Sequence, residues 1–196
     1  MHDKQFIVIP LGIEVANGSH ANIIIIDIVN NTIERFEPNG IHFPRGFYYN
    51  PDLLDNILDN KIINLFKKAG FINFKYMKPS NFLPIIGFQM LETIEDSKCN
   101  KLSDPNGFCA VWCVWWAEQR LLFPTIEPKI LAVELINRIK LANKSFKNII
   151  RNYSINIINI RDEYLHKYNL DINDIINNNY KESDIMNIEK DILEIL

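Results

Sequence analysis

The sequence has few cysteines and few glycines, and both shortages exclude common classes of protein. Its 196 residues include 3 cysteines, Cys99, Cys109 and Cys113, and 7 glycines. A small, odd number of cysteines does not make a disulfide framework, so free thiols in a reducing compartment are expected. The glycines stand singly, so the sequence contains no glycine-rich loop that would hold a nucleotide phosphate.

Long hydrophobic runs and an excess of positive charge are also missing. Apolar stretches such as Ile23 to Ile26 are far shorter than the about 20 residues that a membrane-spanning helix needs. Lysine and arginine number 21 against 24 acids, which does not favour nucleic-acid binding. The start, Met1 to Lys4, has neither the basic region nor the apolar length of a secretory signal. We therefore expect a cytoplasmic protein with no membrane partner.

Hydrophobic patterning predicts an α+β core followed by helices. Apolar β-rich runs predict strands, apolar residues at three- and four-residue spacing predict helices, and Phe108 to Phe123 predicts a helix buried in the middle of the core. The expected strands are 5–10, 21–29, 32–37, 71–77 and 82–91, and the expected helices are 51–69, 108–123, 130–141, 146–165 and 183–196. A composition shift near Phe123 places a domain boundary between a core at 1–125 and a helical C-terminal extension at 126–196.

Cys109 is the first candidate for chemistry. It follows a turn at Asp104 to Gly107 and opens the most apolar helix of the chain. Unpaired N–H groups in a first helical turn stabilise a thiolate, so this position favours a nucleophile. The alternative is a small buried residue, which is the expectation for Cys113, one turn further into the same helix.

A thiolate nucleophile needs an imidazole to exchange its proton and a carboxylate or amide to orient that imidazole. His20 is the best placed of 4 histidines, at the mouth of an apolar strand, and Glu37 closes the partner strand. A tight turn at Asn30 and Asn31 would separate them by about 13 Å along the strand. The pair is therefore possible only if the turn is wider and centred earlier, whereas Asp27 and Glu34 are expected to be solvated hairpin charges.

A zinc site is the first alternative. The three cysteines and His20 include no Cys-x-x-Cys pair and no knuckle turn, so no metal and no cofactor are expected. The tryptophans Trp112, Trp115 and Trp116 are expected to fill the core rather than to form a ligand box.

In the order histidine, acid, cysteine, the chain resembles the cysteine proteases that include the ubiquitin-like-protein proteases and the adenovirus endopeptidase. Four stretches carry the resemblance: Phe6 to Leu11; His20 opening an apolar strand; Ile25 to Asp27 with Thr32 and Ile33; and Pro105 to Cys109. Phe36-Glu37-Pro38 is similar to the adenoviral form, whose acid is a glutamate, and the isoleucine and asparagine bias adds to an expected source in a large DNA virus.

This resemblance implies a papain-like fold of the ubiquitin-like-protease type, with a mixed sheet packed on a central helix. It makes His20 the general base, Glu37 its orienting partner and Cys109 the nucleophile of a thiol protease. Where the family has a glutamine as oxyanion donor, this chain has Asp104, which cannot donate when ionised, so Gln89 is the substitute candidate.

The implied substrates are a ubiquitin or ubiquitin-like conjugate or a viral precursor protein, in host cytoplasm or in a virion. Ala21 stands where the ubiquitin-like-protein proteases have a tryptophan. Two alternatives remain open. Acyltransferases that resemble the same family use the same triad, but they carry basic residues for phosphate-bearing ligands, and this acidic chain has no such cluster. A non-catalytic interaction module could retain the fold.

Overall fold

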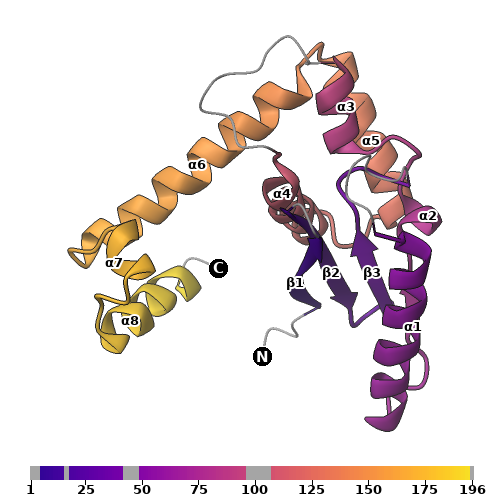
Figure 1. Ribbon diagram of the computed structural model, residues 1–196, viewed down its shortest axis with the longest axis horizontal. Coiled ribbons are helices and arrows are strands. Elements are labelled where there is room, and N and C mark those ends of the chain that lie inside the picture. The colour runs from indigo at the N-terminus through magenta and orange to yellow at the C-terminus, as the bar shows by residue number, and fades with distance from the viewer. Residues whose placement is uncertain (1–4, 16–17, 42–48, 96–106, 195–196) are drawn as a thin grey trace. The chain divides into compact units, whose positions relative to one another are not determined.

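The computed structural model of the chain describes residues 5–15, 18–41, 49–95 and 107–194. These residues form a four-stranded sheet and eight helices, in two compact units, residues 1–150 and 151–196 (Figure 1). The strands are β1 (Phe6–Val15), β2 (Gly18–Asp27), β3 (Thr32–Phe36) and β4 (Lys75–Met77), and the helices are α1 (Pro51–Lys68), α2 (Pro79–Phe82), α3 (Phe88–Glu95), α4 (Cys109–Leu122), α5 (Pro128–Leu141), α6 (Phe146–Lys167), α7 (Ile172–Ile176) and α8 (Glu182–Leu193).

The sheet has the order β1-β2-β3-β4 and is mixed, because β4 runs parallel to β3 while the other neighbours are antiparallel. Asp27 pairs with Thr32, so the loop between β2 and β3 contains residues 28–31. The Asp27 carboxylate accepts hydrogen bonds from the N–H groups of Val29 and Asn30, and Asn31 takes a positive φ of 54°. The hairpin is therefore wider than the two-residue turn that Asn30-Asn31 suggests.

One face of the sheet packs against α1. Ile24, Ile26, Ile33 and Phe74 are buried there, and side chains of α1, among them Leu58, cover them. The helix begins where the sequence predicts, at Pro51, and the Asn50 side chain caps it by accepting the N–H of Leu53.

The other face packs against α4, the predicted central helix. The Trp116 ring stacks on Phe36 of β3 with centroids 4.9 Å apart, and Trp112 and Trp116 are both fully buried. The prediction that the tryptophans form core is confirmed. This packing fixes the axis of α4 against β2 and β3, and with it the position of the helix N-terminus.

The prediction of a strand over 82–91 is wrong. Pro84 and Gly87 interrupt the segment, which begins at the last residue of α2, Phe82, and ends in the first half of α3. Phe88, on the first turn of α3, packs on Trp112 and Trp115 with ring centroids 5.4 and 5.2 Å apart. A short apolar run without strict alternation is compatible with either a buried strand or a buried helix, so the sequence pattern alone could not distinguish them.

The two units divide between residues 150 and 151, whereas the composition shift places a boundary near 125. Helix α5 belongs to the first unit, where Leu131 and Ala132 are buried and α5 contacts α2. Within the second unit, Asp191 of α8 accepts hydrogen bonds from Lys167 and Tyr168. None of the described helices is long and apolar enough to cross a membrane.

Candidate active site

Cys109 begins α4, directly after the buried Phe108 that precedes the helix. Its side chain is partly accessible and hydrogen-bonds with the side chain of His20. Two further contacts to the sulfur come from the backbone, at Ala21 of β2 and Ala110 of α4. The sulfur therefore lies between a helix N-terminus and a strand.

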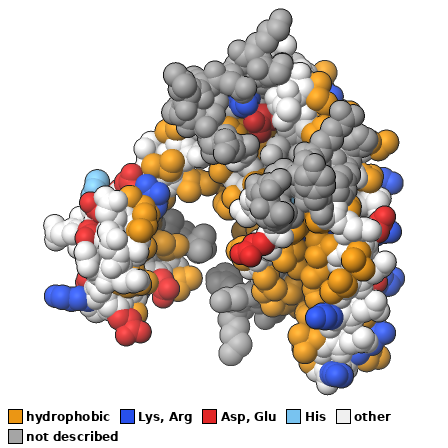
Figure 2. All heavy atoms as spheres, viewed as in Figure 1, with side chains coloured by type: hydrophobic (Ala, Val, Ile, Leu, Met, Phe, Trp, Pro, Cys, Tyr) orange, Lys and Arg blue, Asp and Glu red, His pale blue; other side chains and the backbone are white. Residues whose placement is uncertain are grey.

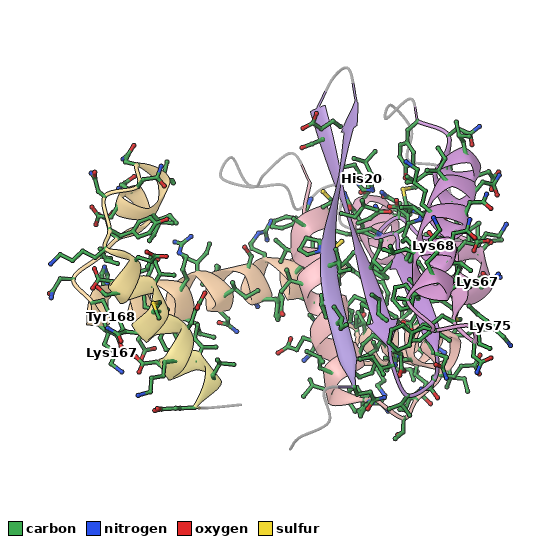
Figure 3. The ribbon with its side chains drawn as sticks, turned by 90° about the horizontal axis from the view of Figure 1, so that it is seen from below. His20, Lys67, Lys68, Lys75, Lys167 and Tyr168 are labelled. Carbon is green, nitrogen blue, oxygen red and sulfur yellow. The ribbon has the colours of Figure 1, made fainter. Side chains whose placement is uncertain are left out.

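His20 lies on β2 among the side chains of the first unit (Figure 3) and is 1% exposed. Its Nε2 is 2.7 Å from Glu37 Oε1, and the His20 side chain also hydrogen-bonds with the Cys109 side chain. The register explains the contact: Ile23 pairs with Phe36, so Glu37 comes next to Asn22, two residues from His20. Diagonal neighbours of this kind are within reach of long side chains. The structure thus brings His20, Glu37 and Cys109 together, through the wider hairpin loop that the sequence required.

The pKa shifts at this cluster favour a thiolate and an imidazolium. Burial lowers the pKa of His20, but hydrogen bonds to Cys109 and Glu37 outweigh burial and raise the pKa to about 9. Burial raises the pKa of the Cys109 thiol, but the hydrogen bonds from His20, Ala21 and Ala110 hold it below its usual value. The two shifts run in opposite directions because each side chain stabilises the charged form of the other, and both shifts favour a pair of thiolate and imidazolium.

Glu37 is 3% exposed and is held by several donors besides His20. Its Oε2 accepts hydrogen bonds from Asn22 Nδ2 at 2.9 Å and from the Tyr49 hydroxyl at 2.8 Å. Its Oε1 also accepts the N–H of Asn39 at 3.0 Å. Burial raises the pKa of Glu37, but His20 and these donors reverse the shift, so the carboxylate stays ionised.

A buried ion pair lies behind Glu37. Arg35 of β3 donates two hydrogen bonds to Asp55 of α1, at 2.7 and 2.8 Å, and a third to the side chain of Asn22. Tyr76 also donates to Asp55, at 2.7 Å. The nearest Arg35 nitrogen is 3.9 Å from Glu37, so the guanidinium faces Asp55 more closely than Glu37. Asn22 connects the two pairs, because it donates to Glu37 and accepts from Arg35.

Gln89 reaches the segment just before Cys109, although it comes from helix α3 and not from a strand. A Cβ atom placed on Gly107 would be 3.1 Å from Gln89 Nε2. The backbones of Gly40 and Gly87 cross so closely that a Cβ on Gly87 would be 2.3 Å from Gly40 N. Gly87 N–H donates to Asn39 and Gln89 N–H to Pro38, which ties the start of α3 to the loop after Glu37. Asp104 lies outside the described residues.

Cys113 is buried, and its thiol donates to the Ala21 carbonyl at 3.5 Å. Burial, together with the nearby charges of Glu37 and Cys109, raises its pKa well above the usual value. It is therefore an inert thiol beside an activated one, as the sequence predicts. Cys99 lies outside the described residues.

The sequence did not identify the residues that support the cluster, namely Asn22, Tyr49, Arg35 and Asp55. Two of them could have been found from the alternation of residues along the strands. Asn22 and Arg35 lie on the same face of the hairpin as the buried Ile24 and Ile33. A polar residue on a buried face needs a partner there.

The expectation that Asp27 and Glu34 are solvated hairpin charges is wrong. Both are fully buried, and Arg120 of α4 donates to Glu34 at 2.9 and 3.0 Å and to Asp27 at 3.4 Å. Burial raises the pKa of Glu34, and Arg120 counteracts that shift. Charged residues at the end of a hairpin are usually exposed to solvent. Here Arg120, on the helix that packs against the sheet, pairs with both carboxylates inside the protein.

The arrangement is suited to nucleophilic chemistry at an acyl carbon. A thiolate at a helix N-terminus, an imidazolium on the same sulfur and an ionised carboxylate behind it are the components of a thiol nucleophile with its acid–base partner. Among the described residues, no group of three or more histidine, cysteine, aspartate and glutamate side chains is placed to hold a metal ion.

Comparisons with known proteins do not support a cysteine protease. No family model matches the chain. The chain is 42% identical, over 196 residues, to a protein of Acanthamoeba polyphaga mimivirus that is named, provisionally, an ankyrin repeat protein. The match covers 98% of this chain and 25% of that relative, so the chain spans about a quarter of the relative's length.

These findings contradict the assignment to the ubiquitin-like-protein and adenovirus cysteine proteases. The relative is named for ankyrin repeats and not as a protease or other hydrolase, so the expected protease and deubiquitinase activities are not retained. The physical reason is that a histidine, an acid and a cysteine in contact recur on unrelated folds, and their order does not identify a family. The papain-like fold stays a prediction.

Proposed function

We propose that Cys109 accepts an acyl group from an activated donor and passes it to an amine or hydroxyl acceptor. The chain would then be a thiol-dependent acyltransferase. The observation that supports this most directly is the His20 ring held between Glu37, at 2.7 Å, and the Cys109 sulfur.

The reaction begins from the thiolate of Cys109 and the imidazolium of His20. The thiolate attacks the carbonyl carbon of a donor thioester, forming a new C–S bond, and the donor's thiolate leaves and takes the proton from His20. The acceptor then loses its proton to His20 as it attacks the acylated Cys109. The Cys109 thiolate leaves, and the starting ion pair is restored.

Negative charge develops on the carbonyl oxygen in both steps. The N–H groups at the start of α4 and the side-chain amide of Gln89, which lies beside Gly107, are suited to stabilise it. Glu37 keeps its charge while Asn22 and Tyr49 fix its position, so it holds the His20 ring beside Cys109. A reducing compartment such as the cytoplasm would keep Cys109 in its free form.

The test uses N-acetylcysteamine thioesters, which are small donors without phosphate groups, and intact-mass spectrometry. The expected result is a mass increase of one acyl group that is mapped to Cys109 and removed by hydroxylamine. Cys109→Ser should lose the adduct, and the matched variant Cys113→Ser should keep it. No adduct on the folded wild-type protein, or equal loss in both variants, would overturn the proposal.

A second function is favoured by the relative's name, since repeat proteins present extended surfaces for binding. We propose that the chain also binds a protein, through the edge strand β1, where Ile7, Val8 and Ile9 are 47%, 37% and 42% exposed. Hydrophobic side chains gather over the strands and α1 on the visible face of the first unit (Figure 2).

This binding function predicts that a photo-crosslinking residue at Val8 captures one defined protein, and that Cys109→Ala does not change the capture. The control places the same residue at Leu53, which is exposed on α1. Identical products from both positions would contradict a binding surface on β1.

A further inference from the structure

An apolar cleft of about 350 Å³ opens beside the Cys109 sulfur. Its floor is the β1–β2 pair, where Gly12 lies directly opposite Ala21, and one wall is the start of α4, with Ala110 and Val114. His20 lies at the same cleft as Cys109. A group bound in this cleft is therefore in contact with the nucleophile.

The residues around the cleft favour an uncharged occupant. None of its lining residues is a lysine, arginine, aspartate or glutamate, and the ionisable groups among them are those of His20 and the two cysteines. A charged group in such surroundings would lose its hydration without gaining a partner, because His20 is already bound to Cys109 and Glu37. The volume is at the lower end of the range for small-molecule sites, about 300 Å³ upward, which suits one apolar chain.

Gly12 is the residue that keeps the cleft open. Its φ is not in the positive region, unlike that of Gly18, Gly40 and Gly70, so its backbone does not require glycine. A Cβ atom on Gly12 would meet no atom within 4 Å, whereas one on Gly40 would be 2.5 Å from Gly87 N. Glycine inside a strand weakens it and often marks a place where a ligand approaches closely.

Val114 supports the same interpretation from the opposite wall. The sequence predicts α4 to be buried all round, but Val114 is 49% exposed although it lies one turn into that helix and lines the cleft. An apolar side chain is thus left without cover beside the nucleophile. Apolar surface around a few polar groups is typical of a ligand site.

We propose that this cleft binds the acyl chain of the donor, that the chain is uncharged, apolar and longer than acetyl, and that Gly12 sets the width available to it. The proposal rests on the acyl-transfer function above and specifies its substrate. Each buried methylene group should raise the rate of Cys109 acylation about fourfold until the cleft is filled.

The experiment measures the second-order rate of Cys109 acylation by N-acetylcysteamine thioesters of acetate, butyrate, hexanoate and succinate. We expect rates that rise from acetyl to hexanoyl, and a succinyl rate at least about tenfold below the butyryl rate, because its carboxylate must be desolvated. Gly12→Trp should remove most of the preference for hexanoyl over acetyl. Leu121→Trp, at an exposed position of α4 outside the cleft, should keep that preference.

The outcomes separate the two proposals. Rates that do not depend on chain length, or a preference that survives Gly12→Trp, would overturn the acyl cleft while leaving the acyltransferase function standing. Failure of every thioester to acylate Cys109 would overturn both. Melting temperatures of both tryptophan variants show whether a lost preference comes from the cleft or from unfolding.

Discussion

Two buried clusters on the β2–β3 hairpin contain the same kinds of charged side chains, but their arginines are paired differently. Each has one arginine and two carboxylates: Arg35 with Asp55 and Glu37, and Arg120 with Asp27 and Glu34. Arg120 contacts both of its carboxylates, at 2.9 and 3.4 Å. Arg35 is bound to Asp55, and its nearest nitrogen is 3.9 Å from Glu37.

The difference shows what makes a buried carboxylate available for chemistry. Glu34 is bound by its arginine and serves stability. Glu37 takes most of its hydrogen bonds from neutral donors, so its charge acts on His20. The neighbours Glu34 and Arg35 belong to different clusters because successive strand residues point to opposite faces.

The largest effect should come from breaking the structural cluster. Arg120→Met leaves the carboxylates of Asp27 and Glu34 buried without their cation, so the free energy of unfolding should fall by about 3–5 kcal/mol. Urea denaturation measures it. Arg138→Met, which removes an exposed pair with Glu134, should change stability by no more than about 0.5 kcal/mol. A loss below about 1 kcal/mol for Arg120→Met would show that the two clusters do not differ in this way.

Next in size is the carboxylate of the site cluster. Glu37→Gln keeps the shape but removes the charge that stabilises the His20 imidazolium, so acylation of Cys109 should slow about 100-fold. Rates of thioester consumption at pH 7 test this. Glu34→Gln, on β3 three residues before Glu37, is the matched control and should cost stability but leave the rate near wild type. Similar slowing in both variants would remove the functional distinction.

The pH dependence sharpens the comparison, because only the site cluster contains a thiol and an imidazole. Iodoacetamide alkylation of Cys109 should titrate below the usual cysteine pKa, and acyl transfer should decline as pH rises through about 9, where His20 loses its proton. His20→Gln should return the Cys109 titration toward an ordinary thiol. A wild-type thiol that titrates at about 8.5 would contradict the ion pair.

The same shifts affect stability with opposite signs. The pKa of His20 is raised on folding, so its contribution is complete below pH 6.5 and is lost as pH rises through about 9. The pKa of Cys109 is lowered, so its contribution is complete above pH 9 and is lost as pH falls through the folded value. Urea titrations should therefore show that the stability difference between wild type and His20→Gln narrows as pH rises through about 9.

The smallest effect concerns Asp55, which we expect to position Arg35 rather than to take part in chemistry. Asp55→Asn weakens the hold on the guanidinium and lets it turn toward Glu37, which should lower the pKa of His20 and slow acylation about threefold to tenfold. An NMR titration of His20 measures the shift. Asp59→Asn, exposed on the same helix, is the control. An unchanged His20 titration in Asp55→Asn would contradict this positioning role.

Local sequence patterns predicted much of the molecule. The hairpin, α1, α4, α5, α6 and α8 follow from the periodicity of apolar residues, whereas the short helix α7 was not predicted. His20, Glu37 and Cys109 could be named as candidates because their residue types and strand positions limited the choices. Their contact depends on the register of β2 with β3, which Asp27 sets through hydrogen bonds to the loop backbone that composition does not reveal.

The features that could not be predicted depend on contacts between residues far apart in the sequence. Gln89 comes from a helix that only tertiary packing distinguishes from a strand, and Arg120 meets Glu34 across 86 positions. Asn22 and Asp55 matter because α1 covers one face of the sheet, a fact that no local window contains.

Ala21 contacts the site through its backbone, so its side chain can change without removing these contacts. Backbone atoms of this residue meet both Cys109 and Cys113, and its carbonyl also accepts from Asn22. Main-chain contacts stay when a side chain is replaced, so the methyl group of Ala21, which faces the cleft, can be exchanged without loss of these contacts to the thiol. Mutation at position 21 could therefore alter the ligand preference of descendants of this protein while the nucleophile keeps its reactivity.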